Sequence, residues 1–294
     1  MNYMIALNGE KPPVLGDFVK GVGMIRSEYL LRNIESYITT ENAKKYVEEY
    51  VAKVCEFYKG KPVWYRTSEL VAPEVNVLQG ADVVLEEKHY VLGTRGVRRG
   101  LKYKETFNKE LQIISILSQK YNNLNILLPY IKDVDELDEI LYMLKKNNFA
   151  GKCGIMLEIP SVFIMLEEFL KRKINNITIG INDLTMLTLG TFRDSEYHEP
   201  CHPAIIKIIR DTVDNVKKYR SDIEVNVAGY ISETFAEMIK GIGTDNLVVH
   251  YKDMPKICNL SEDLFPDMDF VSGVKKLTKS RIKEREEKHA MYNE

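Results

Sequence analysis

A short apolar run that ends abruptly in an amide and a carboxylate occupies Ile177-Thr178-Ile179-Gly180-Ile181-Asn182-Asp183. Three other strand-like runs also end in a charged residue: Gly23-Met24-Ile25-Arg26, Val63-Trp64-Tyr65-Arg66 and Gly154-Ile155-Met156-Leu157-Glu158. Parallel barrels place their functional side chains at the carboxyl ends of the strands. The pattern therefore predicts that two arginines, two carboxylates and an amide meet at one mouth of such a barrel.

Short β-branched or apolar runs alternate with longer amphipathic segments through most of the chain. The sequence predicts about eight strands, at 4–7, 22–26, 62–66, 124–131, 153–159, 177–181, 223–228 and 247–249. Helical periodicity predicts helices between them, among others at 41–58, 111–120, 162–172, 203–218 and 233–242. This order predicts an α/β fold of the (β/α)₈ TIM barrel type. An open doubly wound sheet is the alternative, but no GxGxxG fingerprint follows an early strand.

The chain length fits one large barrel, since such barrels run to about 250 residues. With 294 residues and no low-complexity linker, we expect one barrel over residues 1–274. Residues 275–294 mix both charges densely and predict a charged C-terminal helical tail.

The composition of the chain disfavours some classes of binding partner and some cellular locations. A net charge of −2 gives no basis for binding nucleic acid or an anionic membrane. No apolar stretch approaches the ~20 residues that span a bilayer, and the N-terminal residues lack a signal-peptide pattern. The four cysteines are scattered without a CxxC pair, which favours neither a disulfide framework nor a zinc site. We expect a cytoplasmic protein.

Four arginines are candidates for binding an anion: Arg26, Arg66, Arg95 and Arg193. Guanidinium groups bind phosphate and carboxylate oxygens bidentately, and several together suit a ligand of charge near −3. A surface ion pair is the alternative for each one taken singly. Two of them follow an apolar strand, where burial without a partner would be costly.

Glu158 and Asp183 are candidates for binding a metal. Both follow neighbouring predicted strands, and Mg²⁺ prefers one or two carboxylates together with substrate oxygens and water. Asn182 can donate its amide to a ligand oxygen. Helix capping is the alternative for Asp183, although it does not account for Glu158. The combination suits a small phosphorylated acid held with a divalent cation.

The five histidines show no spacing typical of metal ligands. His202 precedes a predicted helix, and a structural role is favoured for it. His250 follows the last predicted strand within reach of the mouth, but the sequence alone assigns it no role.

The chain resembles the C-terminal barrel of PEP-utilising enzymes, which phosphoenolpyruvate synthase, pyruvate phosphate dikinase and enzyme I of the sugar phosphotransferase system share. Five segments carry the resemblance in family order, over about residues 5–270: Gly21-Val22-Gly23-Met24-Ile25-Arg26-Ser27-Glu28-Tyr29-Leu30, Tyr65-Arg66-Thr67-Ser68-Glu69, Leu92-Gly93-Thr94-Arg95-Gly96, Met156-Leu157-Glu158-Ile159-Pro160 and Ile179-Gly180-Ile181-Asn182-Asp183-Leu184-Thr185. The second segment looks closest to the synthase branch.

The resemblance implies a homodimeric transferase of the kinase type that binds phosphoenolpyruvate (PEP) or pyruvate with Mg²⁺. In such enzymes phosphoryl passes between the substrate and a histidine on a separate swivelling domain. Glu158 and Asp183 would hold the metal, and Asn182 would contact the phosphate. The arginines would bind phosphate and carboxylate: Arg26, Arg66, Arg95 and Arg193. Arg26, Arg66 and Asn182 would thereby act in catalysis, by stabilising the enolate and the transferring phosphoryl group.

The chain departs from the family at the proton donor. The family's Cys-Gly-Glu motif, whose cysteine protonates the enolate carbon, falls here on Ala228-Gly229-Tyr230. Alanine has no proton to give, and Tyr230 and Cys201 are weak substitutes. Slow or altered protonation would follow, or reaction of a longer-lived enolate with a different electrophile.

The 294 residues also contain neither the family's Thr-Ser-His motif nor an ATP-binding domain. The phosphohistidine is therefore expected on a separate polypeptide. A catalytically degenerate PEP sensor, or a regulatory or dimerisation module, is the alternative function.

Overall fold

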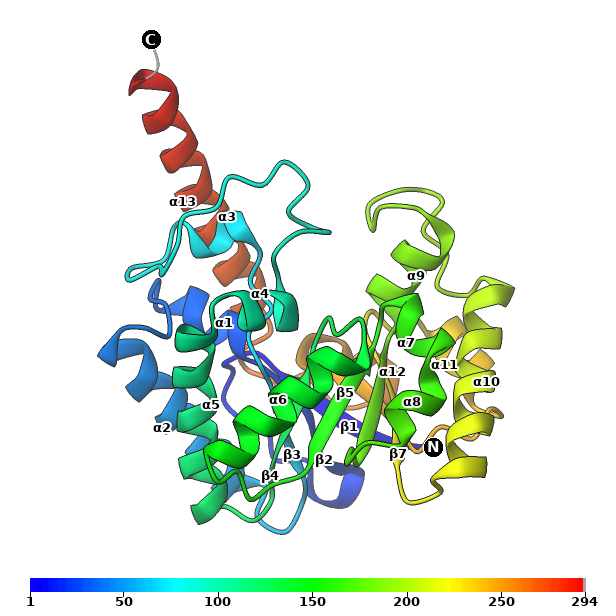
Figure 1. Ribbon diagram of the computed structural model, residues 1–294. Helices are drawn as coiled ribbons and strands as arrows, with labels where there is room; N and C mark the ends of the chain where they lie inside the picture. Colours follow the sequence, from blue (N-terminus) through cyan, green and yellow to red (C-terminus); the bar gives the residue numbers. More distant parts are fainter. Residues whose placement is uncertain (293–294) are drawn as a thin grey trace.

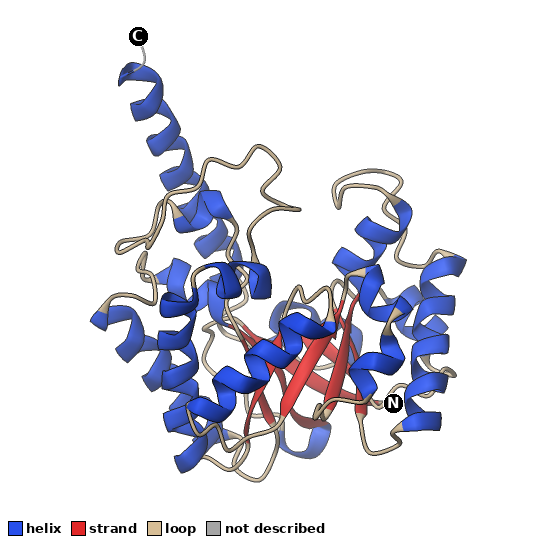
Figure 2. Ribbon diagram, in the orientation of Figure 1, coloured by secondary structure: helices blue, strands red, loops and turns tan. Residues whose placement is uncertain are grey.

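Eight parallel strands close into a barrel in which each strand pairs with its neighbours in chain order. The computed structural model describes residues 1–292. The strands are β1 (Asn2–Leu7), β2 (Val19–Arg26), β3 (Val63–Arg66), β4 (Leu124–Leu128), β5 (Cys153–Leu157), β6 (Asn176–Gly180), β7 (Glu224–Ala228) and β8 (Asn246–His250). Helices surround the strands (Figures 1 and 2), which confirms the prediction of a (β/α)₈ TIM barrel.

Thirteen helices connect and cover the strands of the described chain. They are α1 (Ser27–Asn33), α2 (Glu41–Phe57), α3 (Ala72–Val75), α4 (Gly96–Lys102), α5 (Lys104–Lys120), α6 (Val134–Lys146), α7 (Pro160–Ile164), α8 (Leu166–Leu170), α9 (Ile181–Leu189), α10 (Pro203–Tyr219), α11 (Glu233–Ile239), α12 (Met254–Cys258) and α13 (Phe270–Tyr292). The prediction of a single helix at 162–172 is wrong, because two helices, α7 and α8, occupy this segment. Met165 has φ −100° and ψ 20°, outside helical geometry, and separates α7 from α8.

Polar side chains begin several of these helices at the positions that the sequence favours. Asp133 accepts a hydrogen bond from the backbone N–H of Glu136 at 2.9 Å and caps α6. His202 caps α10, because its Nδ1 accepts from the N–H of Ala204 at 3.2 Å. The structural role predicted for His202 is confirmed.

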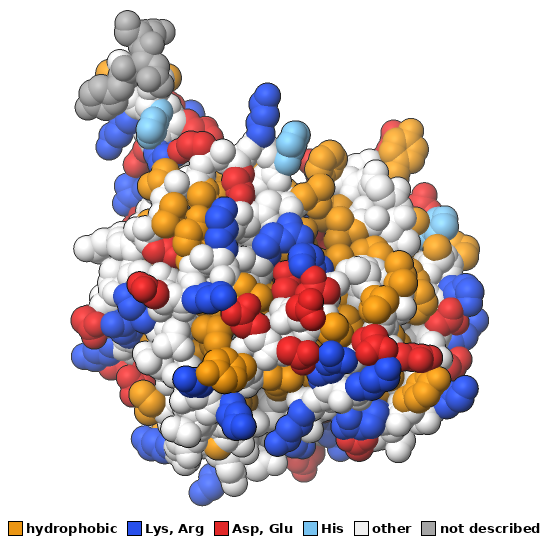
Figure 3. Space-filling model, viewed as in Figure 1, with side chains coloured by type: hydrophobic (Ala, Val, Ile, Leu, Met, Phe, Trp, Pro, Cys, Tyr) orange, Lys and Arg blue, Asp and Glu red, His pale blue; other side chains and the backbone are white. Residues whose placement is uncertain are grey.

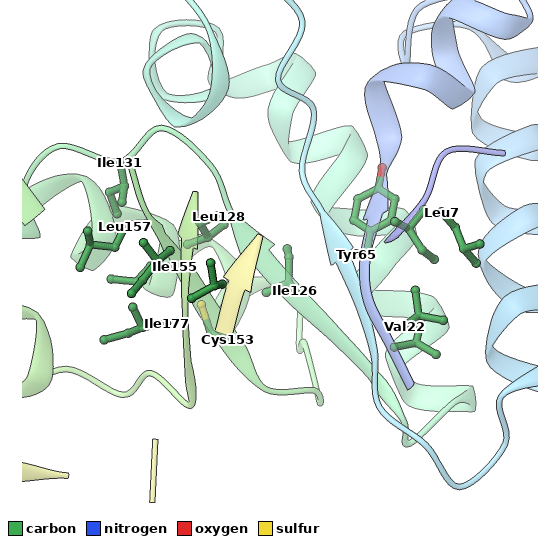
Figure 4. Packing of buried hydrophobic residues seen from close by; sticks show 14 of the residues in the cluster. Leu7, Val22, Tyr65, Ile126, Leu128, Ile131, Cys153, Ile155, Leu157 and Ile177 are labelled. Atoms are coloured by element: carbon green, nitrogen blue, oxygen red, sulfur yellow. The ribbon is translucent and has the colours of Figure 1, made fainter. Parts of the chain in front are cut away.

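Alternation along the strands divides the buried residues into the barrel interior and an outer core. The outward residues, among them Tyr65, Ile155 and Leu157, pack beneath the helices (Figure 4). Eight inward apolar side chains form one layer of the interior: Met4, Ala6, Met24, Trp64, Leu127, Met156, Ala228 and Val248. The next inward positions on β2, β3 and β5 are the charged residues Arg26, Arg66 and Glu158, so the apolar layer forms the floor beneath a charged mouth.

The long helix α13 packs against α1 and α3 and extends beyond the mouth side of the barrel (Figure 1). Arg32 in α1 donates from Nε to Thr278 Oγ1 at 2.9 Å. Farther along, Arg281 forms an ion pair with Glu35. None of the helices described in residues 1–292 is long and apolar enough to cross a membrane.

Gly96, the first residue of α4, is expected to be intolerant of any side chain. Its φ is +53°, and an added Cβ would lie 2.7 Å from Tyr130 Cβ and 2.9 Å from Pro129 O. Gly16 has a similar φ of +50° but no atom within 4 Å of an added Cβ, so it is a matched control. We expect Gly96→Ala to lower the free energy of unfolding by about 3 kcal/mol and Gly16→Ala by only about 1 kcal/mol. Urea titration measures both, and equal losses would contradict the steric argument.

Candidate functional site

A cavity of about 1040 Å³ opens at the carboxyl ends of the strands. Its wall brings together all the residues that the sequence singles out as a site, from β2 through β7: Arg26, Arg66, Arg95, Glu158, Asn182, Asp183, Arg193 and Ala228. Three of these are inward residues one step beyond the apolar floor. Arg26 follows Met24, Arg66 follows Trp64 and Glu158 follows Met156, each two residues along its strand direction.

Seven charged side chains form a continuous series of ion pairs across this cavity, which we call the arginine–carboxylate ladder. Their signs alternate in the order Arg26, Glu28, Arg66, Glu69, Arg95, Asp183 and Arg193. Five of the seven have side chains no more than 7% exposed, and Arg26 and Arg193 at the ends are more open. Each buried charge is therefore flanked by opposite charges on both sides.

The first half of the ladder is centred on Arg66. Arg26 Nε lies 3.0 Å from Glu28 Oε1, and the same carboxylate oxygen accepts from Arg66. Arg66 Nη1 lies 2.7 Å from Glu69 Oε2. Burial alone would raise the pKa of Glu69, but Arg66 and Arg95 outweigh it and lower that pKa to about 2. Glu69 is thus an ionised carboxylate held between two guanidinium groups.

The second half of the ladder is centred on Asp183. Arg95 Nη2 and Arg193 Nη2 lie 3.0 Å and 2.5 Å from Asp183 Oδ2. Arg95 also stacks on Tyr130, with its guanidinium carbon 4.3 Å from the ring centre. Asp183 is the third residue of α9, whose N-cap is Gly180. The alternative interpretation of Asp183 as the helix cap is therefore wrong.

Sequence reasoning did not assign roles to Glu28 and Glu69, although both lie in segments that carry the family resemblance. Glu28 is the second residue of α1, and Glu69 follows β3 by three residues. Their importance depends on which arginines the closed barrel brings next to them. The only sequence signal was a carboxylate two or three residues after each strand-end arginine.

Glu158 differs from the three carboxylates of the ladder because it forms no ion pair within residues 1–292. Its Oε1 accepts the backbone N–H of Tyr130 at 2.6 Å. The pKa of Glu158 is raised to about 8. Burial is the largest cause, the charges of Glu69 and Asp183 add to it, and Arg66 and Arg95 oppose it. Without a cation beside it, this carboxyl is held protonated at neutral pH.

Three carboxylates of the cavity are close enough to share one cation. Ligand oxygens of Glu69, Glu158 and Asp183 all lie within 4.8 Å of one another, and all three residues are buried. Hard carboxylate oxygens are the ligands that Mg²⁺ prefers. Glu158 is the carboxyl without an ion-pair partner, and a cation would compensate its burial, so the donor set fits this metal.

Some buried polar atoms of the ladder lack a hydrogen-bond partner. They include Arg66 Nε, Arg95 Nε and Glu28 Oε2. An unsatisfied buried donor costs about 1–3 kcal/mol, and more when it is charged. Arg66 and Arg95 therefore each keep one buried N–H donor without a partner.

The last part of the wall comes from α9 and the end of β7. Asn182 Oδ1 accepts the backbone N–H of Tyr230 at 3.1 Å. Ala228 is 3% exposed and belongs to the apolar floor, whereas Tyr230 is 66% exposed. Cys201 packs against the outer hydrophobic core instead of the cavity wall. No thiol lines the described cavity.

The raised pKa of Glu158 predicts how stability depends on pH in metal-free protein. The unfolded carboxyl titrates near 4.5 and the folded one near 8, so the folded state binds more protons between these values. Stability through this group is therefore present at pH 4.5 and is lost as the pH rises to 8. We expect Glu158→Gln to remove a decline of roughly 3–5 kcal/mol in unfolding free energy.

Urea unfolding with a chelator at pH 5 and pH 8 measures this effect in both proteins. Glu110, whose pKa burial raises to about 7, contributes a decline of the same sign. That contribution is present in the wild type and in the variant, so their difference isolates Glu158. Identical declines in the two proteins would contradict the assignment.

Comparison with known proteins places the chain among PEP-binding barrels. The family model described as "PEP-utilising enzyme, PEP-binding domain" matches residues 6–263. Phosphoenolpyruvate synthase of Pyrococcus furiosus is 29% identical over 245 residues, which cover 77% of this chain and 30% of that protein. A probable phosphoenolpyruvate synthase of Archaeoglobus fulgidus is 30% identical over 219 residues, covering 68% and 28%.

A Salmonella typhimurium protein described as "Phosphoenolpyruvate-dependent phosphotransferase system" is 27% identical over 237 residues, covering 74% of this chain and 30% of that protein. The chain thus spans about 30% of the length of these curated relatives. The match extends over the strands and loops that build the cavity. The chain belongs to the family of PEP-utilising enzymes, of which it represents the PEP-binding domain.

Proposed function

We propose that this barrel binds PEP or pyruvate together with Mg²⁺ and takes part in phosphoryl transfer with a phosphohistidine on a separate polypeptide. The observation that carries the proposal is the arginine–carboxylate ladder beside the three clustered carboxylates. Cationic groups for a phosphorylated acid and oxygens for a divalent cation meet at one wall. The family match supports the same substrate class.

In this proposal the arginines bind the substrate anion. Each guanidinium has five N–H donors in a planar fork and can hold a ladder carboxylate and a ligand oxygen together. Arg66 and Arg95 line the cavity and belong to the ladder, so their guanidinium groups stand where the substrate anion would bind. Arg26 and Arg193 would add charge from the ends of the ladder, and the Asn182 amide would donate to the phosphate. Donors fixed before the reaction stabilise charge as it develops on the enolate and phosphoryl oxygens.

Glu158 and Asp183 would hold the metal, with Glu69 as a third oxygen ligand. Bound Mg²⁺ would supply positive charge that polarises and orients the substrate oxygens. Glu158 would then lose its proton, because the cation replaces the missing partner of its carboxylate. Asp183 would remain bound to Arg95 and Arg193, which keeps the metal ligand and the anion-binding groups in one rigid network.

A separate phosphoryl partner and a homodimer belong to the same proposal. The cavity opens at the carboxyl ends of the strands, where a phosphohistidine of another chain can reach it. Hydrophobic side chains gather on one side of the molecule (Figure 3). Ile164, Met165, Phe192 and Tyr197 are between 46% and 75% exposed. Such a surface supports contact with another protein chain.

A second candidate is a PEP-binding sensor or regulatory module without turnover. Ala228 favours it, since the barrel floor at the end of β7 offers only a methyl group to the cavity. The ladder would then serve for binding alone. Both candidates need the same anion and metal site, so they separate only in a test of transfer.

Calorimetric titration tests the binding site that both candidates share. We expect PEP to bind in the presence of Mg²⁺ and much more weakly in its absence. Glu158→Gln should weaken the metal-dependent binding by roughly 100-fold, because a direct oxygen ligand is lost. Glu48→Gln on the exposed side of α2 is the matched control and should bind as the wild type does. Tight binding by Glu158→Gln would contradict the proposed metal site.

Transfer distinguishes the two candidates. Incubation of the chain with ³²P-labelled PEP, Mg²⁺ and cell extract should label a second polypeptide at an acid-labile, base-stable phosphohistidine. The label should disappear with Glu158→Gln and remain with Glu48→Gln. Intact PEP binding without any chain-dependent label would favour the sensor.

A further inference from the structure

His250 occupies an inward position at the cavity mouth that the binding chemistry does not use. It is the last residue of β8 and follows the inward Val248 by two, so its side chain faces the cavity that it lines. Val248 pairs in register with Ala228 of β7. The imidazole therefore stands one inward step above the methyl group of Ala228, on the adjacent strand.

The other ionisable strand-end groups already have partners. Arg26 and Arg66 belong to the ladder, and Glu158 accepts the N–H of Tyr130. The His250 side chain makes no hydrogen bond or ion pair within residues 1–292. Burial first, and then the charges of Arg26, Arg66 and Lys275, lower its pKa to about 3. The imidazole is thus neutral and has a free lone pair at the cavity wall.

Other proton carriers near the end of β7 do not fit this position. Tyr230 is 66% exposed, and its backbone, not its hydroxyl, bonds to Asn182. Cys201 lies against the outer core. Lys275 reaches the cavity from α13 with an exposed side chain. His250 is half-buried, lines the cavity, has no side-chain partner within residues 1–292 and stands next to Ala228.

We propose that His250 is the catalytic base and acid that exchanges the proton at the methyl carbon of pyruvate. This inference rests on the proposed function. An imidazole nitrogen takes a proton from C3 of pyruvate, the C3–H electron pair becomes the C2=C3 double bond, and the carbonyl π pair moves to oxygen. The enolate oxygen then attacks the phosphoryl group, and the histidine of the partner leaves with its electron pair. In reverse, the imidazolium returns its proton to C3.

Substrate binding prepares His250 for this step. In the free cavity, the positive charges of Arg26 and Arg66 disfavour a second cation beside them. A carboxylate or phosphate on those arginines offsets their charge, so an imidazolium becomes easier to form when the substrate is present. Bound substrate therefore makes the His250 imidazole a stronger base.

Deuterium exchange tests the step in the full chain without the phosphoryl partner. Pyruvate, Mg²⁺ and the protein are mixed in D₂O, and exchange is measured by NMR as the loss of the methyl proton signal of pyruvate. We expect exchange by the wild type and a loss of at least about 100-fold in His250→Gln, since general-base contributions run from 10² to 10⁴. His289→Gln on the exposed part of α13 is the matched control and should exchange normally. Imidazole added to His250→Ala should restore part of the lost rate.

Calorimetry with PEP on the same samples separates the outcomes. Lost exchange with PEP affinity within threefold of the wild type, together with rescue by imidazole, supports the inference. Undiminished exchange in His250→Gln overturns it, and so does a wild type that binds PEP but exchanges no deuterium. If rescue fails in variants that bind PEP normally, it is also overturned. If the wild type binds no PEP, the proposed function fails first.

Discussion

The cost of burying charge determines how this barrel mouth is built. Arg66 forms ion pairs with two buried carboxylates, and so does Arg95. Removing one partner from a buried ion pair typically costs about 3–5 kcal/mol. The ladder distributes this constraint over several strands and loops, because each carboxylate bridges two arginines. The segments that carry Glu69, Arg95 and Asp183 are consequently fixed to one another across the cavity. A rigid, charged wall can receive an anion with little reorganisation.

The apolar floor makes that wall possible. Side chains such as Met24, Trp64 and Met156 exclude water from the barrel interior directly below the charged residues. Low polarity beneath the ladder strengthens every ion pair above it. It also raises the pKa of Glu158, whose carboxyl forms no ion pair with the arginines within residues 1–292. The same burial thus stabilises the paired charges and leaves one site that a divalent cation would complete.

Much of this arrangement was predictable from sequence, for identifiable reasons. Apolar runs of strand length repeat around the chain, and alternation alone places Arg26, Arg66 and Glu158 on the inward side beyond the floor. Glu28 and Glu69 were not predictable as bridges, because each joins arginines that are neighbours only after the barrel closes. The break between α7 and α8 was not predicted either. Apolar periodicity continues through Met165, whereas the backbone torsions of Met165 are not helical.

Ala228 and His250 show why a functional site is better described by its wall than by single positions. The ladder does not depend on the residue type at the end of β7, since no ladder contact involves Ala228. The adjacent strand places a neutral imidazole above the same point of the floor. Because neighbouring strand ends lie roughly 5 Å apart, proton transfer can move from one strand to the next without displacing the substrate anion. The electrostatic requirement for binding therefore constrains the mouth more strongly than the identity of the residue that carries the proton.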